Sequence, residues 1–230
     1  RNAGDGSYNY VVFDDKDVNI EAVHSRADTI EVDGQQRPRN NSNGKPIAAT
    51  DEGLRNFWKW FGGSKAVDVY GKPLVVYHGA PDARFANQDG TFKTLGERYG
   101  GIEPDKRAFW FSKDRRTAAT YADDRRAFDY QNAEAGIVDA YIRLENPLIV
   151  DANGDYWRTA QRRGKTSDVI AEARAAGNDG AIVRDVKDEY NNIKGTASTT
   201  TYTVFSSNQI KSATNNTGQF SPDNADIRFS

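Results

Sequence analysis

The hydrophobic residues of this chain fall into short runs, many of them alternating with polar residues, as is typical of half-buried strands. Turn residues such as Gly71-Lys72-Pro73 and Asn146-Pro147 separate several of the runs. The pattern predicts strands at residues 8–23, 67–69, 74–78, 108–112, 137–144, 148–150, 180–186, 199–205 and 209–213.

Three segments show helical spacing instead, at residues 52–61, 114–128 and 167–176. Thr50 or Asp51 is expected to cap the first helix, and Ser167 the third, which Gly177 ends. Strands outnumber helices and do not alternate regularly with them, which predicts an α+β fold with a mostly antiparallel sheet.

The chain divides into three regions by composition. Residues 1–32 read as the strand-rich tail of a preceding region, and residues 33–50 as a linker rich in Gly, Asn, Pro, Gln and Ser. Residues 51–230 form the main domain, in which residues 81–107 are expected to be a long polar loop. Because the chain begins at Arg1 without a methionine, we expect it to be part of a longer polypeptide.

The composition excludes several classes of site. Cysteine is absent and only two histidines occur, so we expect no disulfide, no thiolate chemistry and no metal site. The net charge of −2 gives no global attraction to nucleic acid. No apolar run reaches the roughly 20 residues of a membrane span, and no signal peptide is seen, so a cytoplasmic location is expected.

The best candidate site is the end of the strand Val75-Val76-Tyr77-His78-Gly79. The strand ends with an imidazole beside a glycine, whose missing Cβ would let a planar polar ligand approach the backbone. A surface histidine at a strand end is the plain alternative for this pair alone.

Two further segments supply parts that such a site needs. The run Phe109-Trp110-Phe111-Ser112 is followed by Tyr121, eleven residues after Trp110, and rings so placed can sandwich a flat heterocycle. Ordinary core packing explains any one of these rings equally well. Gln209 lies on the last predicted strand.

Together these segments resemble the ADP-ribosyltransferase-like domains of phage and mobile-element polyvalent proteins. The resemblance covers about residues 51–230. Its motifs are Phe57–Asp68, Gly71–Gly79, Phe109–Ser112 with Ala119–Ala122, Glu145–Leu148, Asn178–Val183, Gln209–Ala213 and Asn224–Ser230.

The resemblance implies a split, mostly antiparallel sheet that binds NAD in a cleft and needs no metal. His78 would bind ribose hydroxyls, with Tyr77 next to it, and Gly79 would bind the nicotinamide amide through its backbone. Trp110 and Tyr121 would stack on the nicotinamide, with Phe111 and Ser112 beside them.

Two residues depart from the family pattern. Trp110 stands where tyrosine is usual, which exchanges one flat ring for another. Gln209 stands where a glutamate usually binds the 2′-hydroxyl of the nicotinamide ribose, and a neutral amide gives weaker hydrogen bonds than a carboxylate. We therefore expect transfer of single ADP-ribose units rather than polymer synthesis.

The resemblance implies a mono-ADP-ribosyltransferase that modifies a macromolecule, as a phage or mobile-element effector or toxin delivered into a host cell from a virion. Gln209 also fits a weak or silent NAD-fold module of a virion protein. A nucleic-acid-targeting domain is a third reading. Its basic rim would consist of Arg107, Arg115, Arg116, Arg125, Arg126, Arg162 and Arg163, which a solvated helix face explains equally well.

Overall fold

The computed structural model of the chain describes residues 28–83, 90–92, 107–123, 134–157, 166–188 and 197–228. The strand predicted at residues 8–23 lies outside these ranges, as do most of the loop 81–107 and the end of the second predicted helix. In the part of the chain that is described, no helix combines the length and the apolar character that crossing a membrane requires.

A seven-stranded sheet forms the centre of the molecule, in the order β6-β7-β8-β4-β3-β5-β9. Only β6 and β7 run parallel, and every other neighbouring pair is antiparallel. This confirms the predicted α+β class. The strands are β3 (Val76–Ala80), β4 (Phe109–Ser112), β5 (Gly136–Ile142), β6 (Pro147–Asp151), β7 (Gly180–Val186), β8 (Thr199–Val204) and β9 (Ile210–Ser212).

All three predicted helices are present, as α1 (Asp51–Phe61), α4 (Arg115–Ala122) and α5 (Thr166–Ala175). The Thr50 hydroxyl caps α1 by accepting a hydrogen bond from the Gly53 N–H at 3.0 Å. Gly177 follows α5 with a φ of +72°, a left-handed conformation that glycine adopts without strain. Thr50 and Gly177 therefore mark helix ends as predicted, whereas Ser167, predicted as the cap of α5, lies inside that helix, which begins at Thr166.

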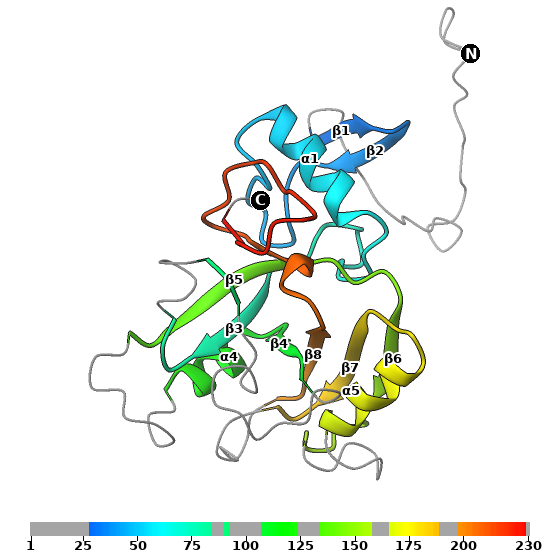
Figure 1. Cartoon of the computed structure of the whole chain (residues 1–230), viewed down its shortest axis with the longest axis vertical. Coiled ribbons are helices and arrows are strands. Elements are labelled where there is room, and N and C mark those ends of the chain that lie inside the picture. The colour runs from blue at the N-terminus through cyan, green and yellow to red at the C-terminus, as the bar shows by residue number, and fades with distance from the viewer. Residues whose placement is uncertain are drawn as a thin grey trace, which may run out of the picture.

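The segment predicted as a linker is folded. It contains β2 (Gln35–Pro38), which pairs with β1 (Thr29–Val32) in a hairpin against α1. Figure 1 shows this hairpin and α1 at one end of the molecule, next to the C-terminal segment. Ile47, also in the segment, packs with the aromatic residues of α1, and the buried Asn41 donates a hydrogen bond to the Tyr141 hydroxyl at 2.8 Å.

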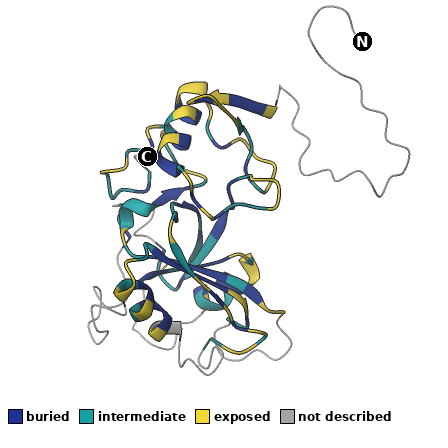
Figure 2. Cartoon of the chain, turned by 90° about the vertical axis from the view of Figure 1, so that its right-hand side faces the viewer, coloured by how far each residue is buried: buried dark blue, intermediate teal, exposed yellow. Residues whose placement is uncertain are grey.

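The two faces of the sheet are covered by different elements, and buried residues concentrate along the strands (Figure 2). Six of its seven strands contribute to one hydrophobic core, on the side that we call the inner face. On the opposite side, the helix face, α5 packs against β7 and α4 against β3. The hairpin and α1 cover the helix face at Tyr77 and Tyr141.

Candidate functional site

The strand β3, which carries His78, lies between β4 and β5 in the sheet. Tyr77 pairs with Ser112 of β4, and His78 pairs with Val138 of β5. Because successive side chains of a strand point to opposite faces, the residues predicted to bind NAD divide between the two faces.

His78 lies on the inner face. Its ring packs against the rings of Phe92 at 5.3 Å and Phe111 at 5.7 Å between centroids, and both phenylalanines belong to the inner core. Its Nδ1–H donates a hydrogen bond to the Trp110 carbonyl oxygen at 2.8 Å. A carbonyl oxygen can only accept, so this bond sets the protonated nitrogen of the ring and joins β3 to β4.

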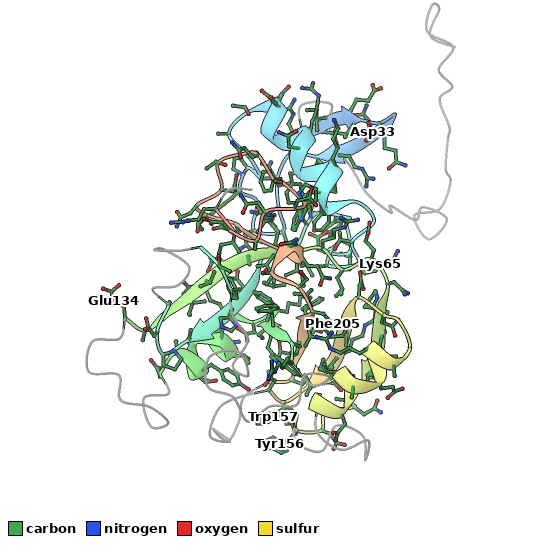
Figure 3. All side chains as sticks on the ribbon, viewed as in Figure 1. Asp33, Lys65, Glu134, Tyr156, Trp157 and Phe205 are labelled. Carbon is green, nitrogen blue, oxygen red and sulfur yellow. The ribbon has the colours of Figure 1, made fainter. Side chains whose placement is uncertain are left out.

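The helix face carries the other predicted residues. Trp110 packs on the cluster that contains the buried residues of α5, and so does Phe205, which follows β8 (Figure 3) and lies under the Arg174 guanidinium of α5. Tyr77 and Ser112 share this face because they are register partners. The structure therefore brings Tyr77, Gly79, Trp110, Ser112 and Tyr121 to one face, and places the side chains of His78 and Phe111 on the other.

Gly79 serves a different purpose from the one expected. A Cβ at this position would lie 1.7 Å from the Ala118 carbonyl oxygen and 3.0 Å from the Ala122 nitrogen. The missing side chain therefore admits the backbone of α4, and α4 covers the surface that a ligand was expected to approach.

A row of buried hydroxyl groups lies on the helix face, contributed by α4 and by the strands β4 and β8. We call this row the hydroxyl seam. The Ser112 and Thr199 hydroxyls lie 3.3 Å apart. Thr117 is 1 % exposed, and its hydroxyl has no hydrogen-bond partner in the described structure. The members of the seam are Ser112, Thr117, Thr199, Thr201 and Thr203.

The sequence analysis missed Asp188, which follows β7 and reaches the seam. Its Oδ1 accepts a hydrogen bond from the Tyr121 hydroxyl at 2.5 Å, and its Oδ2 accepts one from the Thr201 hydroxyl at 2.6 Å. The residue keeps some exposed surface, but its carboxyl group is buried, and burial raises the pKa of Asp188 despite these two hydrogen bonds. In the sequence Asp188 stands with Asp185 and Glu189, a group that is typical of solvated surface charge, so it was not counted among the site residues.

The side chain of Gln209 is held by backbone groups on every side. Its Oε1 accepts hydrogen bonds from the Phe205 and Ser206 N–H groups, and its Nε2 donates to the carbonyl oxygens of Arg143 and Asp179, all within 3.0 Å. The amide thus closes a capping box and ties the end of β5 to the start of β7. These four bonds use both donors and both acceptor positions of the amide.

Gln209 is also distant from His78. His78 pairs with Val138, whereas Gln209 binds the carbonyl of Arg143, five residues further along. At about 3.3 Å per strand residue, roughly 16 Å separates the two positions. The structure therefore does not bring the two predicted catalytic residues together.

An open groove of about 560 Å³ begins where the hydroxyl seam reaches the surface, at Tyr77 and Thr199. This size is in the usual range for a small-molecule site. Three cationic side chains line the groove, of which Arg115 lies 3.8 Å from Asp139 and Arg116 lies 3.3 Å from Asp114. The remaining lining residues are Lys113, which is the third cation, and Asp114, Asp185, Ser198 and Thr200.

The rim of arginines is seen only in part. Arg125, Arg126, Arg162 and Arg163 lie outside the described residues. The guanidinium of Arg174 donates a hydrogen bond to the Arg107 carbonyl oxygen at 2.6 Å. Among the described residues, no group of three or more His, Asp or Glu is arranged to hold a metal ion.

Comparison with known protein families identifies a match. A family model described as "ADP-Ribosyltransferase in polyvalent proteins" matches residues 68–220. This range includes both aromatic rings, His78, Asp188 and Gln209. No curated protein matches the chain. No solved structure matches it either.

Proposed function

Since the chain belongs to the family of ADP-ribosyltransferases in polyvalent proteins, we propose that it transfers single ADP-ribose units from NAD to a macromolecular acceptor. The family match over residues 68–220 is the observation that carries this proposal. The reaction breaks the bond between C1′ of the ribose and the nicotinamide nitrogen. A nucleophile of the acceptor forms the new bond to C1′ and loses its proton, and nicotinamide leaves as a neutral molecule.

The proposed reaction needs little covalent help from the protein. Its transition state resembles a ribose oxocarbenium ion, so positioning of the donor and electrostatic complementarity supply most of the rate enhancement. A site for this chemistry must hold the nicotinamide flat and bind the ribose hydroxyls.

The hydroxyl seam and the adjoining groove offer these contacts. Tyr121 and Trp110 place a phenol and an indole on the helix face, and either ring can stack on nicotinamide. The Thr117 hydroxyl, buried without a partner in the described structure, is suited to a polar ligand group. In the groove, the cations Lys113, Arg115 and Arg116 complement the charge of the NAD diphosphate.

His78 and Gln209 then act as positioning residues in this proposal. His78 holds the backbone of Trp110 from the inner face, and Gln209 ties the two halves of the sheet together. The geometry favours these roles over the direct contacts with NAD that the sequence suggested, because the His78 ring packs on the inner face and backbone groups engage the whole Gln209 amide.

The test is release of nicotinamide from NAD by the purified chain, together with transfer of label from adenylate-labelled NAD to proteins of a cell extract. We expect W110A to lower kcat/KM for NAD by about tenfold, from the loss of a stacked ring and its buried surface. Y70A, which removes a 57 % exposed tyrosine remote from the seam, is the matched control and should behave as wild type.

Three results would separate the alternatives. Binding of NAD without cleavage would favour a silent NAD-fold module, for which the fully engaged amide of Gln209 is an argument. Neither binding nor cleavage of NAD would refute the proposal. Label on nucleic acid rather than protein would identify the acceptor class.

We further propose that the chain acts as an effector of a phage or mobile element inside a host cell, because the family is named for polyvalent proteins.

A further inference from the structure

Burial of the Asp188 carboxyl group lowers the folding stability of the chain. Among the described residues, no cation forms an ion pair with its carboxyl group, which is held by two hydroxyl donors alone. An unpaired carboxylate in a buried position costs folding free energy that an apolar residue would not. Stability alone therefore does not account for an aspartate here.

The two hydroxyl donors come from separate elements. Thr201 is on β8, in register with Ser112 of β4, and Tyr121 is on the last turn of α4. The carboxyl group of Asp188 thus ties α4 to the sheet through the phenol of Tyr121. Hydrogen bonds to a charged acceptor are the strong ones, and a tyrosine ring has only two side-chain torsions to fix.

The hydrogen bond between Tyr121 and Asp188 lies on the side of α4 that carries a second buried polar side chain, Thr117. Thr117 and Tyr121 are four residues apart in α4, so they lie on the same stripe of the helix. The Thr117 hydroxyl, which has no partner among the described residues, is therefore one helical turn from the bound phenol of Tyr121. A ligand that stacks on the ring would find this buried donor beside it.

We propose that Asp188 is a positioning residue that fixes the ring of Tyr121 as the stacking surface for nicotinamide. The inference rests on the proposed function, because it names the ligand of the ring. It predicts that Asp188 affects the binding of NAD by holding Tyr121 and does not contact NAD itself.

The experiment measures nicotinamide release by wild type, D188N, Y121F and the double variant D188N/Y121F. An asparagine keeps the size of the side chain but gives only neutral hydrogen bonds, and a phenylalanine keeps the ring without its hydroxyl. A hydrogen bond to a charged group corresponds to about a tenfold effect or more, so we expect KM for NAD to rise about tenfold in D188N. We expect kcat to change by less than about threefold, since the ring contributes binding in both ground and transition states.

Y121F should reproduce the effect of D188N, and the double variant should be no worse than either single variant. The control is D123N, which removes an exposed carboxylate two residues from Tyr121 and should match wild type. Circular dichroism and thermal melting of each variant establish that it is folded, and Y121F carries the test if D188N does not fold.

Effects of D188N and Y121F that multiply in the double variant would overturn the inference, because Asp188 would then act independently of Tyr121. Wild-type kinetics in both single variants would overturn it as well. A wild-type chain that does not bind or cleave NAD would instead refute the proposed function, and with it the ligand assigned to the ring.

Discussion

Replacement of Gly79 by alanine tests how α4 is held against the sheet. The new Cβ would lie 1.7 Å from the carbonyl oxygen and 2.7 Å from the carbonyl carbon of Ala118, both of them backbone atoms. Backbone of a helix cannot rotate away as a flexible side chain can. The helix must therefore retreat by about 1.5 Å or more to restore van der Waals contact.

The expected cost follows from this displacement. Overpacking of a well-packed interior costs about 1–3 kcal/mol, and G79A belongs at the upper end because α4 must move as a body. We expect the free energy of unfolding to fall by about 3 kcal/mol, which is a shift of roughly 1.5 M in the urea midpoint at an m-value of about 2 kcal/mol per M. Because Tyr121 moves with α4, release of nicotinamide should fall as well.

Urea unfolding followed by circular dichroism measures this change. G63A is the matched control, because its nearest contact is the Glu145 carboxylate oxygen at 3.8 Å and Gly63 does not have a positive φ. It should stay within about 0.5 kcal/mol of wild type. If G79A were as stable as G63A, α4 would not lie against β3 as described, and the account of the helix face would be wrong.

Two further predictions concern buried polar groups. Q209E replaces an amide that donates to two backbone carbonyls by a carboxylate that repels them, so thermal melting should show a loss of about 2–4 kcal/mol. Lys211 is fully buried, and burial lowers its pKa from 10.5 to about 8, with Asp226 opposing the shift. Between pH 8 and 10.5 the unfolded chain therefore binds more protons than the folded chain. The wild-type free energy of unfolding should consequently rise with pH across this range, by on the order of 2 kcal/mol relative to K211M. Equal pH dependence of the two proteins in urea titrations would contradict the assignment of Lys211.

The elements of the fold could be predicted because each depends on local signals. The aromatic residues of α1 recur at helical spacing behind Thr50, and Gly177 ends α5. The hairpin of β1 and β2 could not be predicted in this way. Its second strand, Gln35–Pro38, is polar and short, and it pairs only because the preceding turn and α1 hold it in place.

The division of the site between two faces was also beyond local reasoning. His78 and Gly79 are adjacent in the sequence, and adjacent residues of a strand always serve opposite faces. The family resemblance implied that His78, Trp110 and Tyr121 share one site. Which face α4 covers depends on the close approach of its backbone to Gly79, and that contact is a tertiary property.

Asp188 and Gln209 show why polar residues were the hardest to assign. Each is defined by partners far away in the sequence: Tyr121 is 67 residues from Asp188, and Arg143 is 66 residues from Gln209. Gln209 has all its hydrogen bonds met by backbone groups, which is what a structural tie requires. Asp188 has a buried carboxyl group whose partners among the described residues are two hydroxyls, next to a buried hydroxyl without a partner there. Of the two, Asp188 is therefore the residue whose cost to the fold calls for an explanation in binding.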